Sequence, residues 1–99
     1  MKSKKDLREL YDECIEFWGV KAQLRQTQEE CAELILAISH FLRNRPNSLK
    51  NLVEETADVY LMLNQIIRIV GKSNVMKVVD FKSDRVKDKL ERYKKKESI

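Results

Sequence analysis

The sequence predicts an all-α protein, a four-helix bundle of antiparallel helices. Its 99 residues include only two Gly and one Pro, 36% of them are charged and 7% are aromatic, a composition that favours helices over strands. Apolar side chains recur at the three- and four-residue spacing of amphipathic helices. A chain of this length builds one hydrophobic core, so we expect a single domain over residues 1–99 that ends in a basic, frayed tail at 94–99.

The first two helices are each predicted by one apolar stripe. We expect the first at about residues 5–18, where Leu7, Leu10 and Cys14 fall on the stripe and Gly19 follows as a break. The second should span about residues 20–43 and end before the turn at 44–47, which contains Pro46.

Capping residues delimit the other two helices. The third is expected at about residues 49–70, with Ser48 as its N-cap and Gly71 directly after its end. The fourth should start near residue 74, capped by Ser73, and fray in the lysines after Tyr93. The short connections favour antiparallel neighbours in a bundle.

The N-terminal residues and the cysteines bear on the compartment. Residues 1–8 are basic and polar without an apolar signal region, and no apolar run approaches the ~20 residues of a spanning helix. We therefore expect a cytoplasmic protein with no membrane partner. Cys14 and Cys31 occupy apolar positions and form no metal-binding spacing, so both are expected to be buried, reduced thiols.

The excess positive charge is confined to the C-terminal end. Residues 1–81 hold 12 basic and 12 acidic side chains, whereas residues 82–99 hold 8 basic and 4 acidic ones. Such a tail alone favours nucleic acid or another polyanion. Cations at a solvated helix end explain much of the excess, because they complement the helix dipole. We therefore expect no nucleic-acid partner.

The most informative feature is a pair of acidic clusters. Between Phe17 and Val79 the carboxylates are Glu29, Glu30, Glu33, Glu54, Glu55 and Asp58. Residues three positions apart share a face of a helix, so each cluster places two acids on one side of its helix. Two such helices packed antiparallel bring four acids together, and these repel one another unless a cation lies among them. Oxygen ligands of this kind suit Mg²⁺ or Mn²⁺.

Helical geometry also places two of these acids within apolar stripes. Glu55 points in nearly the same direction as Met62, and Glu30 aligns with Leu34. Alternatively, the acids face solvent and pair with lysines, as an average Glu does. The positions three and four residues from Glu30 and Glu55 hold no Lys or Arg, so a compensating metal is the preferred interpretation.

A basic residue occupies an apolar stripe in the predicted fourth helix. Lys82 falls between Val79 and Val86 on that stripe, with Arg85 at its edge. An inward-facing cation there is suited to meet phosphate. Alternatively, the Lys82 side chain runs along apolar surface to water or pairs with one of the acids. Both interpretations stay open.

The two acidic motifs resemble those of a known enzyme family. Glu29-Glu30-Cys31-Ala32-Glu33 and the later Glu55-Thr56-Ala57-Asp58 are similar to the EExxE and ExxD motifs of MazG-like nucleoside triphosphate pyrophosphohydrolases. The Gln-rich sequence ahead of the first motif and the basic stretch from Lys82 to Arg85 also resemble the family. The resemblance covers about residues 18–92.

The resemblance implies an Mg²⁺-dependent enzyme, with Mn²⁺ as a possible substitute, that cleaves a nucleoside triphosphate to a monophosphate and pyrophosphate. It assigns Glu30, Glu33, Glu55 and Asp58 to the metal. Glu29 or Glu33 would activate water, and Lys82 and Arg85 would contact phosphates. The resemblance also assigns Trp18, Gln23 and Gln26 to a pocket for the base. Alternatively, Trp18 belongs to the core and the two glutamines lie on a helix surface. The family further implies a homodimer or homotetramer.

Two alternatives differ in substrate or in function. Phosphoribosyl-ATP pyrophosphohydrolases share similar acidic motifs but usually carry a Tyr-His pair soon after the second one. Here Tyr60 is followed by Leu61, which disfavours that substrate. A catalytically silent helical module that binds nucleotide, metal or nucleic acid is the other alternative, and the complete set of motif acids argues against it.

Overall fold

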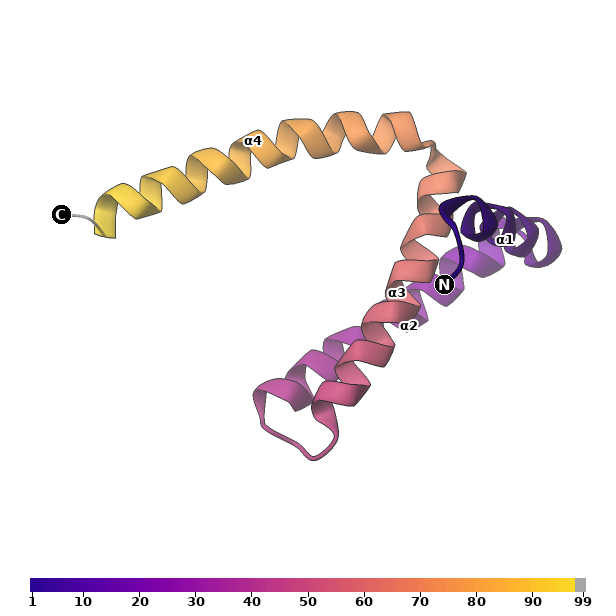
Figure 1. Ribbon diagram of the computed structural model, residues 1–99, viewed down its shortest axis with the longest axis horizontal. Coiled ribbons are helices and arrows are strands. Elements are labelled where there is room, and N and C mark those ends of the chain that lie inside the picture. The colour runs from indigo at the N-terminus through magenta and orange to yellow at the C-terminus, as the bar shows by residue number, and fades with distance from the viewer. Residues whose placement is uncertain (98–99) are drawn as a thin grey trace. The chain divides into compact units, whose positions relative to one another are not determined.

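The computed structural model describes residues 1–97, and the regular elements in this range are four α-helices with no strand. Figure 1 shows their order. The helices are α1 (Lys4–Trp18), α2 (Val20–Leu42), α3 (Ser48–Val70) and α4 (Lys72–Glu97). The structure therefore confirms the predicted all-α class, and the predicted helix bounds differ from the observed ones by only a few residues.

Helix α1 is capped by local hydrogen bonds at its start. The amide of Asp6 donates to Ser3 Oγ at 3.0 Å, and the Ser3 amide donates back to the Asp6 carboxylate at 3.4 Å, which is a capping box. Gly19 ends the helix with φ +90° and ψ 155°, a backbone conformation that is essentially restricted to glycine. The predicted break between the first two helices is thus a single glycine.

The turn between α2 and α3 contains two asparagines with positive φ. Asn44 has φ +56° and Asn47 has φ +60°, and Asn tolerates this left-handed region better than most residues. α3 begins at Ser48 itself, so Asn47 takes the cap position that the sequence analysis gave to Ser48. The chain reverses direction over these few residues.

The bounds of α4 correct two expectations. Gly71 has φ +100° and directly follows α3, as predicted. However, α4 starts at Lys72, so Ser73 lies inside the helix and is not its cap. The helix continues beyond Tyr93 to Glu97, and residues 98–99 of the expected frayed tail lie outside the described part of the chain.

The chain divides into two units, Met1–Ile69 and Val70–Ile99, and each is described by itself. The first unit contains α1, α2 and nearly all of α3. The second is essentially the single helix α4, whose described side chains are exposed apart from Val75. A lone helix has no core of its own, so the single domain and the four-helix bundle stay predictions.

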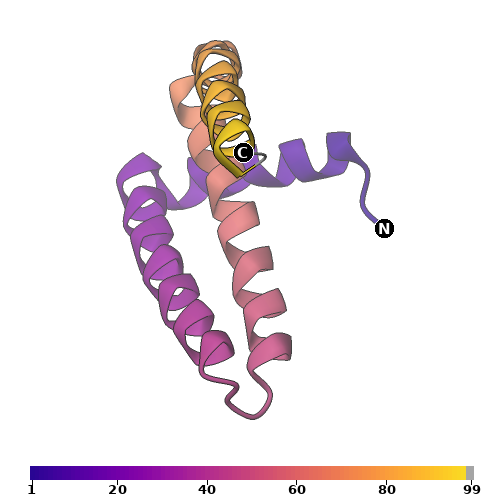
Figure 2. The same ribbon diagram turned by 90° about the vertical axis from the view of Figure 1, so that its left-hand side faces the viewer.

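Within the first unit, α2 and α3 lie side by side and run in opposite directions, as Figures 1 and 2 show. Gln23 near the start of α2 donates to Gln65 near the end of α3, with 2.6 Å between Nε2 and Oε1. Helix α1 crosses this pair (Figure 2) and is joined to α3 where Arg68 donates two hydrogen bonds to Asp12, at 2.9 and 2.7 Å.

The core of the first unit is small. The buried apolar side chains are Tyr11, Ala37 and Met62. Cys14 is half-buried, but Cys31 is exposed, and both are free thiols; the expectation that Cys31 is buried is therefore wrong for the single chain. Many large apolar side chains of α2 and α3 also remain exposed. Within residues 1–97, no helix combines the length and apolarity that crossing a membrane requires.

Candidate metal centre

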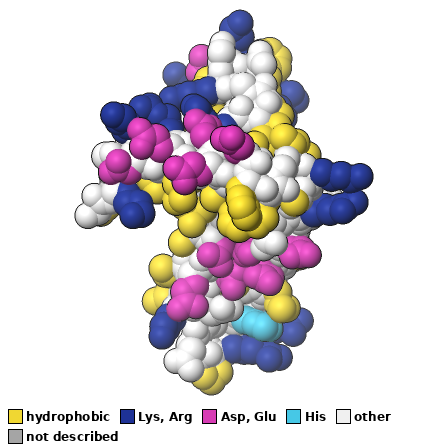
Figure 3. Space-filling view, turned by 90° about the vertical axis from the view of Figure 1, so that its right-hand side faces the viewer, with side chains coloured by type: hydrophobic (Ala, Val, Ile, Leu, Met, Phe, Trp, Pro, Cys, Tyr) yellow, Lys and Arg dark blue, Asp and Glu magenta, His cyan; other side chains and the backbone are white. Residues whose placement is uncertain are grey.

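Three of the four acids assigned to the metal come together between α2 and α3. One carboxylate oxygen each from Glu30, Glu55 and Asp58 lies within 4.8 Å of the other two. Glu55 and Asp58 are one helical turn apart on α3, and Glu30 approaches them from α2. Figure 3 shows acidic side chains gathered beside a hydrophobic patch where these two helices lie together.

Two of these carboxylates hold an oxygen without a partner. Oε2 of Glu30 and Oε2 of Glu55 are buried and make no hydrogen bond. The other oxygen of Glu30 accepts a bond from Gln26 Nε2 at 2.9 Å. A buried acceptor that loses water without gaining a donor costs about 1–3 kcal/mol. The site therefore contains acceptor capacity that the described protein atoms do not satisfy and that a cation would.

The protonation of Glu30 reflects this environment. Partial burial raises the pKa of Glu30 above its ordinary value, and the neighbouring carboxylates Glu33 and Asp58 raise it further. The hydrogen bond from Gln26 acts in the opposite direction, because it stabilises the ionised form. The pKa of Glu30 is raised overall because ionising this carboxyl costs free energy at a partly buried position beside other carboxylates, and a bound cation would lower that cost.

Glu33 and Glu29 take different positions around this triad. Glu33 is close enough to influence Glu30, yet it is exposed and is not one of the three mutually close acids. Glu29 is also exposed. Their predicted roles, Glu33 at the metal and either residue at the attacking water, stay predictions.

A cavity of about 420 Å³ adjoins the acids in the first unit. Side chains of α1, α2 and α3 line it, and Glu30 and Asp58 belong to the same lining as its apolar walls. The full lining is Leu10, Tyr11, Cys14, Trp18, Ala22, Gln23, Gln26, Glu30, Asp58, Leu61, Met62 and Gln65. The acids are thus continuous with a partly open space whose walls are mainly apolar.

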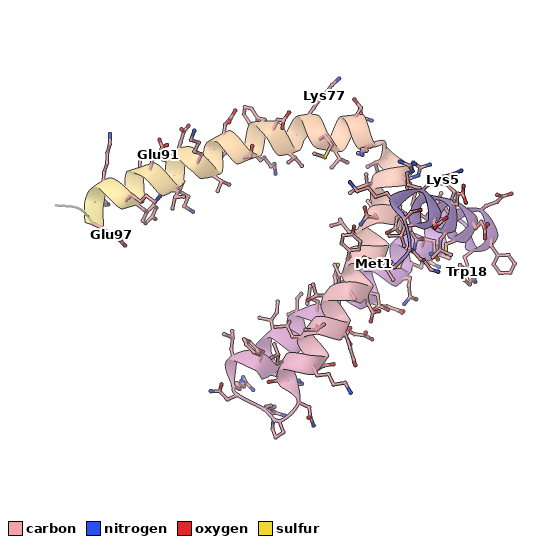
Figure 4. All side chains as sticks on the ribbon, in the orientation of Figure 1. Met1, Lys5, Trp18, Lys77, Glu91 and Glu97 are labelled. Carbon is pink, nitrogen blue, oxygen red and sulfur yellow. The ribbon has the colours of Figure 1, made fainter. Side chains whose placement is uncertain are left out.

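All three residues predicted for a base pocket line this cavity. Gln23 is buried and bonded to Gln65, whereas Gln26 is exposed and bonded to Glu30. Figure 4 labels Trp18 at the C-terminal end of α1. Its side chain is 58% exposed, so the interpretation of Trp18 as a core residue is wrong. An indole on the wall of an open cavity remains free to contact a ligand.

Two cavity residues were missed by the sequence analysis. Gln65 lies two helical turns beyond Asp58 on the same side of α3, a spacing that could have marked it as a neighbour of the acids. Tyr11 is buried with its hydroxyl unpartnered, and nothing in its spacing separates it from an ordinary core residue. Burial raises the pKa of Tyr11, with a smaller contribution from Tyr60, so its hydroxyl stays protonated at neutral pH.

The predicted phosphate-binding residues belong to the second unit. Lys82 and Arg85 are both exposed within their own unit, and whether Lys82 faces inward or toward solvent in the assembled protein stays open. The Arg85 guanidinium carbon lies 6.0 Å from the centroid of the Phe81 ring, at the outer limit of a cation–π contact. A contact of Lys82 or Arg85 with phosphate stays a prediction.

Comparisons with known proteins found no match for this chain. No family model matches the sequence, and neither a curated protein nor a solved structure matches it.

Proposed function

We propose that this protein is a Mg²⁺-dependent nucleoside triphosphate pyrophosphohydrolase that converts a ribo- or deoxynucleoside triphosphate to the monophosphate and pyrophosphate. The single observation that carries the proposal is the triad of Glu30, Glu55 and Asp58, with one unpartnered buried oxygen on each of the two glutamates. Removal of non-standard nucleotides from the pool is a biological role consistent with this chemistry.

The donor set fits a hard divalent cation. All three groups are carboxylates from two helices, and Mg²⁺ prefers oxygen ligands, commonly a few carboxylates completed by phosphate oxygens and water. Mn²⁺ accepts the same donors. A purely structural role for three adjacent acids is disfavoured, because the salt bridges within the described part of the first unit, Lys5–Glu9 and Arg68–Asp12, do not involve the triad.

The reaction is a hydrolysis in which the oxygen of water forms a bond to the α- or β-phosphorus. The bond from that phosphorus to the α–β bridging oxygen breaks, which gives the nucleoside monophosphate and pyrophosphate. When bound, Mg²⁺ neutralises phosphate charge and polarises the phosphorus centre. Glu30, Glu55 and Asp58 would hold the cation and thereby fix the triphosphate. Glu33 or Glu29 accepts the proton that water loses. Lys82 and Arg85 are proposed to contribute positive charge to the phosphates.

The placement of α4 and the oligomeric state form part of the same proposal. We propose that α4 completes a four-helix bundle of the MazG type, and that the protein assembles as a homodimer or homotetramer. Large apolar side chains exposed on α2 and α3 support assembly, since contiguous exposed apolar surface in a small protein often marks an interface.

The test is pyrophosphate release from a panel of ribo- and deoxynucleoside triphosphates with Mg²⁺ or Mn²⁺. The wild type should release pyrophosphate only with metal. Glu55→Gln should lower kcat/KM by at least about 100-fold, because it removes one anionic ligand from the centre. Glu54→Gln is the matched control, since Glu54 is the exposed neighbour outside the triad. Equal activity of both variants, or silence of the wild type across the panel, would refute the proposal.

A further inference from the structure

The net positive charge of the protein is carried by α4. Residues 72–97 hold ten basic and five acidic side chains, whereas residues 1–71 hold ten basic and eleven acidic ones. All the charged side chains of α4 are exposed within their own unit. The second unit is thus a cationic surface on a chain whose other unit is nearly neutral.

The cations are not spread evenly around α4. Successive residues of an α-helix are about 100° apart around its axis, so cations separated alternately by three and four residues fall on one side, within an arc of about 80°. Five of them form this basic ridge: Lys82, Arg85, Lys89, Arg92 and Lys96. Within residues 72–97 no acid falls in the arc. Asp80, Asp84 and Glu91 lie on another side of the helix, and Asp88 lies beside the arc.

The ridge is continuous, and its charges are not neutralised by neighbours. From Lys82 to Lys96 it extends about 21 Å, at 1.5 Å per residue, because α4 runs through this range without a break. Among the described residues, the ridge cations form no ion pair. Two open surface hollows of about 370 and 340 Å³ lie along the ridge, and Lys89 and Arg92 line both. Asp88 also lines the larger one.

The helix dipole explains only the end of this row. The last turn of α4 contains Lys94, Lys95 and Lys96, and the interaction of cations with the dipole is confined to that turn. Lys89 lies about two turns before the end of the helix and Arg85 about three. The sequence analysis set a polyanion aside on the ground of the dipole, and that ground does not extend to these upstream cations.

We propose that the basic ridge of α4 binds single-stranded nucleic acid. The cations contact phosphates along the strand, and the rings of Phe81 and Tyr93 stack on bases. This inference goes beyond the proposed function and does not rest on it, since neither the acidic triad nor a bound metal takes part.

Two exposed aromatic side chains favour nucleic acid over other polyanions. Phe81 is 65% exposed and Tyr93 is 59% exposed, and their positions border the arc of the ridge on its two sides. The Arg85 guanidinium carbon lies 6.0 Å from the Phe81 ring centroid, and Tyr93 lines one hollow together with Lys89 and Arg92. Proteins that bind single strands combine a cationic track with aromatic rings on which bases stack.

An anionic lipid surface and a duplex both fit α4 less well. A helix that lies in a lipid interface inserts a side rich in Trp, Phe or Leu, whereas the apolar side of α4 next to the ridge is mainly valine, with Val75, Val79, Val86 and Leu90. In a duplex the bases are already stacked on one another, so Phe81 and Tyr93 would have no base face to contact.

The experiment measures fluorescence anisotropy of a fluorescein-labelled oligothymidylate of about 20 nucleotides with the full chain in EDTA, which excludes metal-dependent chemistry. The wild type should bind saturably at low salt. Five phosphate contacts give a slope of log K against log salt of about −3.5, so the affinity should fall about 100-fold between 50 and 200 mM salt. The duplex of the same sequence should bind more weakly.

Two double variants separate the ridge from the overall charge of α4. Lys89→Gln with Lys96→Gln removes two ridge cations and should weaken binding at least about tenfold at low salt, with a slope shallower by about 1.4. Lys87→Gln with Lys94→Gln is the matched control. It removes two exposed lysines with the same seven-residue spacing, but from the opposite side of the helix, and it should weaken binding much less.

Stacking is tested by a second pair of variants. Tyr93→Ala should weaken binding at least about fivefold, because it removes a ring on which a base stacks. Tyr93→Phe keeps the ring and should bind as the wild type does. All these positions are exposed in α4, so the variants should fold as the wild type does, and circular dichroism verifies this.

The outcomes are independent of any pyrophosphate release. Salt-dependent binding that falls in the ridge variant and in Tyr93→Ala, but not in their controls, supports the inference even if the protein hydrolyses no triphosphate. Absence of saturable binding at low salt, or equal losses in the two double variants, overturns it even if triphosphates are hydrolysed. Tighter binding to the duplex, or to vesicles that contain phosphatidylserine, assigns the ridge to that partner and overturns the single strand.

Discussion

Glu30 and Glu55 face each other between α2 and α3, and each holds one carboxylate oxygen that is buried without a hydrogen-bond partner. Neither is compensated by a basic neighbour along its own helix. Like charges at this separation repel, and partial burial weakens the screening by solvent. The metal-free protein therefore carries a local destabilisation that is tied to its proposed site.

Neutralising one of these acids should stabilise the metal-free protein. We expect Glu55→Gln to raise the free energy of unfolding by about 1 kcal/mol, because it removes one of the facing charges and supplies an amide donor to Glu30. Urea denaturation in EDTA measures the change. Glu54→Gln should have no effect, because Glu54 is exposed and lies outside the triad. A loss of stability in Glu55→Gln would show that the carboxylate has a structural partner.

Bound metal should make the wild type more stable than Glu55→Gln. A cation that binds only the folded state at 100 times its Kd stabilises that state by about 2.7 kcal/mol. The wild type should thus gain stability on addition of Mg²⁺ or Mn²⁺, and Glu55→Gln should gain much less. Thermal denaturation with and without metal measures both gains. Equal gains in the two proteins would place the cation elsewhere.

The raised pKa of Glu30 should make stability depend on pH. Between the ordinary Glu pKa and the raised value of the folded state, the folded protein binds more protons than the unfolded chain. The free energy of unfolding contributed by Glu30 is therefore greatest below the unfolded pKa and falls as the pH rises through the folded pKa. Glu30→Gln should flatten this part of a stability-against-pH curve measured without metal. An unchanged slope would contradict the assignment.

The sequence predicts the helices and the three acids of the triad. The helices follow from the spacing of apolar residues and from Gly19, Pro46 and Gly71, since these signals act within a few residues. The convergence of Glu30 with Glu55 and Asp58 followed from placing two helical faces opposite each other, and the structure brings these three together. Local periodicity was sufficient for the helices, whereas the convergence of the acids also required the assumption that two helices lie side by side, and Glu33 is not one of the three mutually close acids.

Other features depend on contacts that periodicity does not encode. Trp18 fits the stripe of α1, yet it is exposed. Cys31 likewise falls at an apolar position and is exposed. The buried pairing of Gln23 with Gln65 joins residues far apart in the chain, and polar residues like these are more often found at the surface. Sequence pattern alone assigns such residues to the wrong environment.

The stability contributed by the Arg68–Asp12 ion pair between α1 and α3 should depend on pH in the opposite sense to the stability contributed by Glu30. The Arg68 hydrogen bonds lower the pKa of Asp12 below its ordinary value. Their contribution to stability is fully present above the unfolded pKa and is lost as the pH falls through the folded pKa. Arg68→Gln should therefore lower the free energy of unfolding at neutral pH, and the difference should shrink in acid.

The control for this link is another ion pair on the surface. Lys5 and Glu9 are 4.0 Å apart on α1 and both are exposed, so Glu9→Gln should have little effect. Urea denaturation over a series of pH values compares the two variants. A pH-independent loss in Arg68→Gln would mean that the arginine acts by packing rather than through Asp12.

Replacement of the glycine between α1 and α2 should be costly. Gly19 has φ +90° and ψ 155°, and a side chain added there would meet no atom within 4 Å. The cost of Gly19→Ala therefore arises from backbone strain alone, about 1–3 kcal/mol. Chemical denaturation measures it. A neutral result would show that the backbone at this position relaxes without strain.

The proposed assembly should depend on one face of α3. Leu49, Val53, Tyr60 and Leu63 are all exposed, and their spacing places them on the side of the helix opposite Asp58. Sedimentation velocity at micromolar concentration should give the mass of a dimer or tetramer, and Val53→Asp should shift it toward the monomer, because a buried charge disfavours an apolar contact. Lys50→Glu, an exposed charged position beside this face, should not. A monomeric wild type would contradict the proposed assembly.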